Sequence, residues 1–165
     1  MPDSPLRLAL YQPDIPQNTG TMLRACACLG VAASIIEPAG FPMSDKHFRR
    51  AGMDYLDKVA LLRHDSFADF MLWRTQMQAE QGGHRLLLLT TQGATQYTNF
   101  AFAKGDILMV GRESAGVPAS VHALADERLK IEIAPQMRSL NVALSAAMVL
   151  GEALRQLAIQ DRSEC

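Results

Sequence analysis

The chain has 165 residues, of which 48% are hydrophobic and 20% are charged. This is enough apolar material for one core, and no linker, repeat or low-complexity stretch divides it, so we expect a single domain over residues 1–165. The formal net charge of −1 argues against a non-specific nucleic-acid binder, because such proteins are usually basic.

Cysteine content and the start of the chain indicate where the protein works. Three cysteines cannot form an evenly paired disulfide framework, so we expect a reduced, cytoplasmic protein. Residues 1–5 lack the positive region and apolar run of a signal peptide. No apolar stretch in the sequence approaches the roughly 20 residues that a membrane span needs, so no membrane partner is expected.

Apolar runs alternate with helical patterns along the chain. The runs expected to form strands lie at 6–11, 31–36, 59–62, 85–90, 107–110 and 129–133. The helical patterns lie at 18–29, 44–51, 64–81 and 140–159. This alternation predicts an α/β domain with a mainly parallel sheet flanked by helices. Ligands bind such sheets beyond the carboxyl ends of the strands, so the loops after residues 89, 110 and 133 are the candidate site.

The first expected helix carries two candidate residues. Asn18 can cap its N-terminus, which would be a purely structural role. Arg24 lies off the apolar stripe of this helix, and the pattern places it in the second turn. A cation there gains nothing from the helix dipole. An anionic partner is therefore expected for Arg24, either a ligand or a structural carboxylate.

A loop with two glycines follows the strand at 107–110 directly. It reads Gly-Arg-Glu-Ser-Ala-Gly-Val-Pro over residues 111–118. Gly111, at the strand end, would let a ligand approach the backbone closely. The loop lacks both the Lys-Ser/Thr of a P-loop and the G-x-G-x-x-G dinucleotide fingerprint. On spacing alone it could also be an ordinary turn.

The third candidate site is the start of the last helix, Arg-Ser-Leu-Asn at 138–141. Ser139 would be a good N-cap, which is a structural role. The helix that follows carries small residues at helical spacing, which suit close packing either in the core or in a dimer interface. These small residues are Ala143, Ala146, Ala147 and Gly151.

A basic segment near residue 50 is the best candidate for contacts with phosphate. Residues 44–64 contain five Lys or Arg against three Asp or Glu. Lys46, Arg49 and Arg50 lie together at its start. A solvated helix face is the ordinary explanation for so modest an excess, and the sequence leaves both interpretations open.

In the order and residues of these motifs, the chain resembles the tRNA (cytidine/uridine-34-2′-O)-methyltransferases of the SPOUT superfamily. The resemblance runs from residue 6 to about residue 157. Shared stretches include Tyr-Gln-Pro-Asp-Ile-Pro-Gln-Asn-Thr-Gly at 11–20 with Arg24, Ile-Ile-Glu-Pro at 35–38, and the loops at 111–118 and 138–141. The most specific stretch is Arg-Arg-Ala-Gly-Met-Asp-Tyr at 49–55, which separates the wobble enzymes from other ribose methylases of the superfamily.

The resemblance implies a fold, a cofactor and partners. The fold is the SPOUT fold, in which the C-terminal segment threads a loop to make a deep trefoil knot, and the family members are homodimers. The cofactor is S-adenosylmethionine, which needs no metal, and the substrate is tRNA rather than DNA, with leucine isoacceptors expected. The residues that would contact the cofactor are Leu89, Thr90, Gly111, Ile131, Ser139 and Leu140. Those that would contact tRNA are Lys46, Arg49, Arg50 and Arg138.

The resemblance also assigns catalytic roles to Asn18, Arg24, Glu113 and Asn141. Arg24 is the family's candidate for activating the ribose 2′-hydroxyl. Arginine essentially never loses its proton in proteins, so we expect it to stabilise the developing alkoxide instead. The two asparagines would orient the arginine and the nucleotide, and Glu113 would hold the second loop. The alternatives are ribose methylation of rRNA or of another tRNA position, and a non-catalytic module that binds RNA or S-adenosylmethionine.

Overall fold

The structure is a computed structural model that describes residues 4–42 and 44–165. The side chains of residues 52–54, within the most specific stretch at 49–55, lie outside the described residues.

Seven parallel strands form one sheet in the order β3-β2-β1-β6-β4-β7-β5. The strands are β1 (Arg7–Tyr11), β2 (Ala32–Ile36), β3 (Leu61–His64), β4 (Leu86–Leu89), β5 (Thr95–Gln96), β6 (Ile107–Val110) and β7 (Glu127–Lys130). The helices are α1 (Pro16–Leu29), α2 (Lys46–Leu56), α3 (Phe67–Gln81), α4 (Ala119–Leu124) and α5 (Val142–Ser163), with a short 3₁₀ turn at Tyr97–Asn99. The expected α/β domain with a parallel sheet is confirmed.

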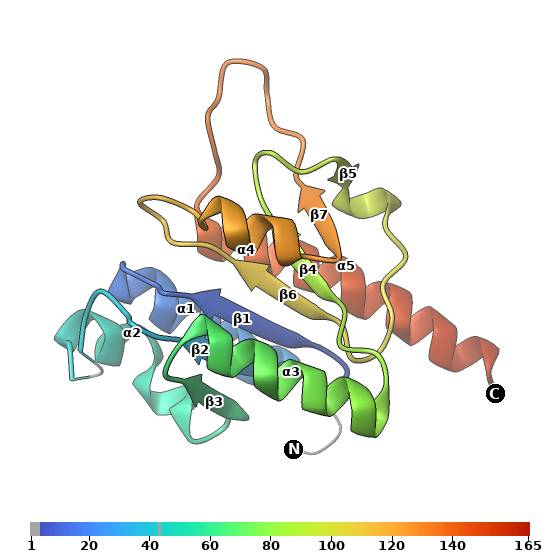
Figure 1. Cartoon of the computed structure of the whole chain (residues 1–165), viewed down its shortest axis with the longest axis horizontal. Coiled ribbons are helices and arrows are strands. Elements are labelled where there is room, and N and C mark those ends of the chain that lie inside the picture. Colours follow the sequence, from blue (N-terminus) through green and yellow to red (C-terminus); the bar gives the residue numbers. More distant parts are fainter. Residues whose placement is uncertain (1–3, 43) are drawn as a thin grey trace.

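Two hydrophobic cores lie on opposite faces of the sheet, because successive strand residues point to opposite sides. On β1, Leu8 and Leu10 join the core under α1 and α5, whereas Ala9 and Tyr11 join the core under α3 and α4. Figure 1 shows the resulting three layers, with α3 and α4 in front of the sheet and α1 and α5 behind it. The middle strands are therefore buried on both sides.

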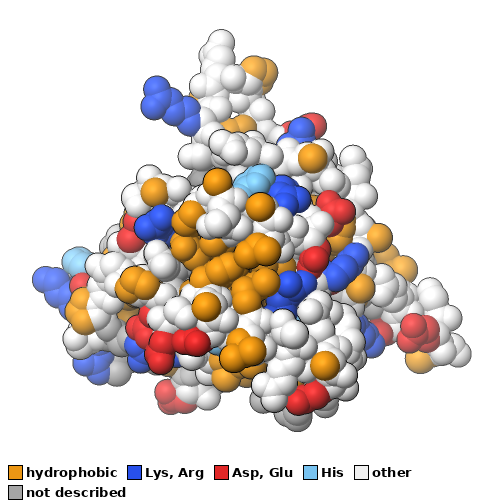
Figure 2. Space-filling model, in the orientation of Figure 1, with side chains coloured by type: hydrophobic (Ala, Val, Ile, Leu, Met, Phe, Trp, Pro, Cys, Tyr) orange, Lys and Arg blue, Asp and Glu red, His pale blue; other side chains and the backbone are white. Residues whose placement is uncertain are grey.

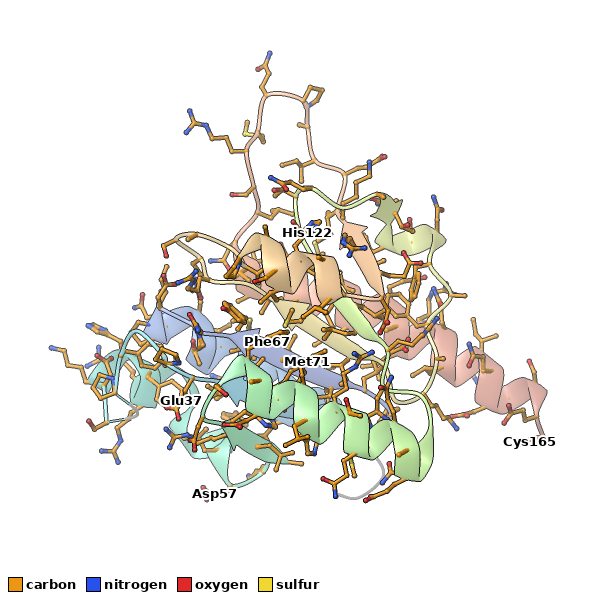
Figure 3. The ribbon with its side chains drawn as sticks, viewed as in Figure 1. Glu37, Asp57, Phe67, Met71, His122 and Cys165 are labelled. Carbon is orange, nitrogen blue, oxygen red and sulfur yellow. The ribbon has the colours of Figure 1, made fainter. Side chains whose placement is uncertain are left out.

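The face that carries α3 and α4 leaves some hydrophobic side chains at the surface. Figure 2 shows hydrophobic side chains gathered in the middle of this face. Phe67 and Met71 of α3 lie beside this patch, below His122 of α4 (Figure 3), and both are only partly buried. The same face lies away from α5, the longest helix.

The boundaries of two helices correct the expected capping roles. Helix α1 begins at Pro16 after the N-cap Ile15, so Asn18 lies inside the first turn and is not the cap. Arg24 consequently lies in the middle of α1, and the argument that the helix dipole disfavours it is wrong. Helix α5 is capped by Asn141, whose Oδ1 accepts from the backbone N–H groups of Ala143 at 2.8 Å and Leu144 at 3.2 Å, so Ser139 is not the cap either.

Several strand limits also differ from expectation. The third strand lies at Leu61–His64 rather than 59–62, and the last at Glu127–Lys130 rather than 129–133. Strand β5 and helix α4 were not expected. Strand β5 has only two residues and exists through pairing with β7, where Thr95 lies opposite Leu129. Elements this short leave too little periodicity to detect in a sequence.

Helix α5 corrects the expectation that no apolar stretch is long enough to span a membrane. The helix has 22 residues and contains an 18-residue window with a mean hydropathy of 1.5, which by length and composition alone is enough. Its inner face, however, packs on the sheet through buried residues such as Val149 and Leu150. Gln156 also binds the backbone at Phe100 and Phe102, with both bonds at 2.9 Å. One such helix is weak evidence of a span, because the core helix of an α/β domain passes the same test.

Candidate functional site

A pocket of about 460 Å³ opens beyond the carboxyl ends of β4, β6 and β7. Three loops line it: the turn after β4 at Thr90 and Thr91, the loop after β6, and the segment from Ile131 to Val142 that leads into α5. Its volume falls in the range of about 300–1,000 Å³ that is usual for small-molecule sites. The position is the one that the strand order predicts for a ligand of a parallel sheet.

Most of the expected site residues line this one pocket. All the expected cofactor residues are present, together with three of the expected catalytic residues: Leu89, Thr90, Gly111, Ile131, Ser139, Leu140, Asn18, Glu113 and Asn141. Further lining residues were not singled out, although they lie in the same loops and strand ends: Leu88, Thr91, Val110, Arg112, Gly116, Val117, Ile133, Val142 and Ser145. Proximity to the motif residues was the only sequence signal for this second group.

Gly111 is required by the backbone of its own loop. Arg112 and Gly116 form a closed bridge, with N–H···O distances of 3.1 and 2.8 Å, and Gly116 has φ +61°. A Cβ at residue 111 would lie 2.8 Å from the Gly116 Cα and carbonyl carbon. The loop is therefore both a tight turn and part of the pocket wall, so the two interpretations of the sequence are compatible.

Asn18 and Asn141 join two distant parts of the chain at the pocket rim. The Asn141 Nδ2 donates to the Asn18 Oδ1 at 3.1 Å, linking the first turn of α1 to the start of α5. Asn141 meanwhile caps α5 through its Oδ1, so both ends of its amide are engaged. This geometry fixes the orientation of both side chains beside the pocket.

Glu113 meets a second carboxyl group, that of Asp14 in the loop between β1 and α1. The Glu113 N–H donates to Asp14 Oδ1, and the Asp14 N–H donates to Glu113 Oε2, both at 3.2 Å. The Ser114 hydroxyl also donates to Asp14 Oδ2. Burial, followed by the contact with Asp14, raises the pKa of Glu113 to about 7, whereas the hydrogen bond from the Glu113 side chain lowers the pKa of Asp14. Asp14 was not expected in the site, because the sequence gives no sign of a pairing across 99 positions.

Arg24 lies outside the pocket, on the exposed side of α1. Its guanidinium carbon lies 4.7 Å from the centre of the Tyr55 ring, a cation–π contact between α1 and α2. The partner found is therefore an aromatic ring rather than the expected anion.

The expected tRNA-binding residues are exposed and lie in two separate places outside the pocket. Lys46, Arg49 and Arg50 lie on α2, whose N-terminus is capped by Asp45. Arg138 lies in the segment between β7 and α5, which projects from the body of the molecule (Figure 1). None of these four side chains lines the pocket. Over residues 4–42 and 44–165, moreover, no cluster of three or more His, Cys, Asp or Glu side chains could hold a metal ion.

Comparison with known proteins places the chain in a family. Residues 5–151 match the SpoU rRNA Methylase family. The tRNA (cytidine(34)-2′-O)-methyltransferase of Beijerinckia indica subsp. indica is 67% identical over 150 residues, which cover 91% of each chain. A solved structure from work on the 2-OH methylation of C/U34 on tRNA is 40% identical, with a TM-score of 0.84 and coverage of 93% of this chain and 96% of that one.

A second structural neighbour carries a ligand. It is the SpoU methyltransferase AviRb from Streptomyces viridochromogenes in complex with the cofactor AdoMet. It is 25% identical, with a TM-score of 0.87, and the match covers 94% of this chain and 62% of that one. The resemblance to SPOUT methyltransferases is confirmed, and this chain belongs to the SpoU rRNA methylase family.

Proposed function

We propose that this protein transfers a methyl group from S-adenosylmethionine to the ribose 2′-oxygen of the wobble nucleotide, position 34, of tRNA. One observation carries the proposal: three loops after buried parallel strands converge on a single pocket that gathers Asn18, Glu113 and Asn141 with the expected cofactor residues. The similarity to tRNA (cytidine(34)-2′-O)-methyltransferases gives the reaction and the nucleotide.

The pocket suits the proposed cofactor. Leu88, Leu89, Ile131 and Ile133 offer apolar walls to an adenine ring. Polar groups of Thr90, Thr91, Ser139 and Asn141 lie on the same lining and can bind a ribose and an amino-acid tail. Glu113, in the same lining, has its Oε1 buried without a hydrogen-bond partner among the described residues. The sulfonium of S-adenosylmethionine supplies an already activated methyl group.

The remaining chemistry falls to side chains of this chain. The paired amides of Asn18 and Asn141 would orient the ribose at the rim of the pocket. Arg24 would donate hydrogen bonds to the 2′-oxygen as negative charge develops there, which is worth most in a preorganised site. The stacking on Tyr55 would hold the guanidinium in place. The proton of the 2′-hydroxyl would leave to water or to a phosphate oxygen, because arginine cannot accept it.

We also propose a homodimer in which Arg24 serves the pocket of the partner. Leu144, Ala147, Met148 and Gly151 form an exposed stripe along α5, and α5 packs beside α1. Ala143 and Ala146 are buried in the core and so are not available for this contact. A stripe of this kind suits helix packing against a second copy. Sedimentation of the 18.1 kDa chain should give twice that mass, and an active monomer would contradict the proposal.

Two finer features of the proposal rest on the family resemblance. The segment after β7 would pass through a loop to form the trefoil knot. Leucine isoacceptors in the cytoplasm would be the substrates, and methylation of individually purified tRNAs would test this choice.

The function is tested by methyl transfer from radiolabelled S-adenosylmethionine. We expect label in total tRNA, and in position 34 after nuclease mapping, with no label in ribosomal RNA. Label in rRNA instead would favour the substrate that the family description names. Cofactor binding without transfer to any RNA would favour a non-catalytic module. Residue-level mapping separates position 34 from other tRNA positions.

The shared site has its own test in mixed dimers. One chain carries Arg24→Ala and the other carries Gly111→Val, and at a limiting concentration of S-adenosylmethionine each substitution is expected to impair its own homodimer. If Arg24 acts across the interface, half of the sites in the mixed dimer contain both substitutions and half contain neither, so activity returns. If Arg24 acts within its own chain, every site in the mixed dimer is damaged and activity stays lost.

A further inference from the structure

Glu113, in the wall of the pocket, forms a carboxyl pair with Asp14, which does not itself line the pocket. They come from loops after neighbouring strands, β1 and β6, and each accepts the backbone N–H of the other. Gly40 supports this arrangement from behind, since its N–H donates to the Pro13 carbonyl at 2.8 Å and a Cβ on it would lie 2.9 Å from Asp14 Cβ. The pair is therefore held by three loops and has little room to separate.

Two carboxylates in contact cannot both be ionised without a large electrostatic cost, so such a pair holds one proton between them near neutral pH. Asp14 is the better site for the charge, because it accepts from the Glu113 N–H and the Ser114 hydroxyl. Glu113 is the better site for the proton, because it is half-buried and its Oε1 has no partner among the described residues. The pKa of Glu113, raised to about 7, agrees with this division.

Few other charges act on Glu113. Of the residues that line the pocket, only Arg112 and Glu113 are charged, and the turn after β4 and the segment before α5 contribute uncharged side chains. The guanidinium of Arg112 lies 5.8 Å from the Tyr11 ring, and its Nε donates to the Gly116 carbonyl. Within the described residues, Asp14 is the charged group that shifts the Glu113 pKa. Arg112 is not among the groups that shift the pKa of Glu113, so a positive charge that a ligand brought close would be a new influence on the pair.

We infer that the Asp14–Glu113 pair discriminates between pocket ligands by charge, releasing its shared proton when a cationic sulfonium ligand binds and keeping it when a neutral thioether binds. This inference rests on the proposed function, which identifies those ligands as S-adenosylmethionine and S-adenosylhomocysteine. Release of the proton leaves two carboxylates opposite one added positive charge, which removes the cost of ionising both.

The inference gives the pocket a preference for methyl donor over demethylated product. Methylation of a 2′-hydroxyl yields the ether, the thioether and one proton. When the pocket loses the positive charge, the pair takes up a proton, so the two states of the pair match the two states of the reaction. Below the pKa of the pair, a cationic ligand must displace a proton, so its affinity for the pocket decreases as the pH falls. The affinity of the neutral ligand does not depend on the protonation of the pair.

The test is calorimetric titration of the full chain with each ligand, in buffers of different ionisation enthalpy. We expect S-adenosylmethionine to release about half a proton at pH 7 and close to a full proton at pH 6, and S-adenosylhomocysteine to release distinctly less. The affinity ratio of donor to product should rise about tenfold between pH 6 and pH 8, as linkage predicts for a group of pKa near 7. Equal proton release for the two ligands would overturn the inference.

Variants assign the effect to the pair. Glu113→Gln and Asp14→Asn should each remove the difference in proton release, whereas Glu80→Gln on the exposed surface of α3 should retain it. Titration of the ligands' own amino group persists in every variant and is subtracted. If Glu113→Gln folds poorly, NMR of the parent chain provides a second test. The chemical shift of the Glu113 carboxyl carbon should move toward the value of an ionised carboxylate when S-adenosylmethionine binds, but not when S-adenosylhomocysteine binds. No movement would overturn the inference. Binding of neither ligand would instead refute the proposed cofactor pocket.

Discussion

The pocket and the α2 surface hold their polar side chains in opposite ways. At the pocket, Asn18 is tied to Asn141 and Asp14 to Glu113, so distant loops fix one another. On α2, Lys46 and Arg50 extend from an exposed helix face. A small ligand gains most from groups that are already oriented, whereas a phosphate backbone is attracted by charges that need no fixed geometry. The contrast indicates that the two regions serve different ligands.

Arg24 lies on the exposed side of α1, outside the pocket, and its removal is expected to have the largest effect. If it stabilises charge that develops only during transfer, Arg24→Ala should slow single-turnover methylation of saturating tRNA by about a hundredfold to a thousandfold. Affinity for S-adenosylhomocysteine should be nearly unchanged, because Arg24 is proposed to act on the ribose 2′-oxygen rather than on the cofactor. Arg24→Lys should restore part of the rate, since a point charge cannot reproduce the planar guanidinium. Parent rates in Arg24→Ala would make the residue structural.

Gly111→Val should damage the pocket side alone. The added Cβ would lie 2.8 Å from the Gly116 backbone, and overpacking of this kind costs about 1–3 kcal/mol. If that strain opens the loop, affinity for S-adenosylhomocysteine should fall by roughly fivefold to a hundredfold in calorimetry. The matched control is Ala119→Val, on an exposed residue just beyond the same loop. Unchanged affinity in Gly111→Val would remove residue 111 from the cofactor site.

Arg50→Glu should damage the RNA side alone. Loss of one phosphate contact should lower the magnitude of the salt slope for tRNA binding by roughly one or somewhat less, while cofactor affinity stays at the parent value. Arg49→Glu should behave similarly. Arg162→Glu at the far end of α5 is the control for a change in net charge alone. Equal slopes for Arg50→Glu and the parent would show that α2 is only a solvated face.

Substitution of Arg138 is expected to have the smallest effect, and it tests whether the pocket and the RNA-binding surface are distinct. It directly precedes Ser139 of the pocket lining, yet its own side chain is exposed and does not line the pocket. Arg138→Ala should weaken tRNA binding only a few fold, with cofactor affinity unchanged, because one exposed phosphate contact contributes little by itself. Met137→Ala is the neighbouring control without charge. A loss of cofactor affinity in Arg138→Ala would place this residue in the pocket region instead.

The residues that line the pocket could be predicted from the sequence better than the contacts between distant loops that hold them in place. The strand at 107–110 was placed correctly because four consecutive buried apolar residues leave a clear pattern, and the loop after it had to lie at the carboxyl edge of the sheet. The contact of Asp14 with Glu113 could not be anticipated, since it depends on β1 and β6 being neighbours. The stacking of Arg24 on Tyr55 likewise depends on how α2 folds back on α1.

Chain order in the sheet has a consequence for biosynthesis. The hydrogen bonds at the pocket rim join residues that lie 99 positions apart (Asp14 and Glu113) and 123 positions apart (Asn18 and Asn141). The second bond cannot form until the start of α5 has been synthesised. Contacts of such separation form late, because a long loop must close before they contribute any stability. A nascent chain that has emerged only as far as β6 therefore has β1 and the first helix in place but no enclosed site. We therefore expect the ability to bind a ligand in the pocket to appear in one step near the end of translation, rather than to increase gradually with chain length.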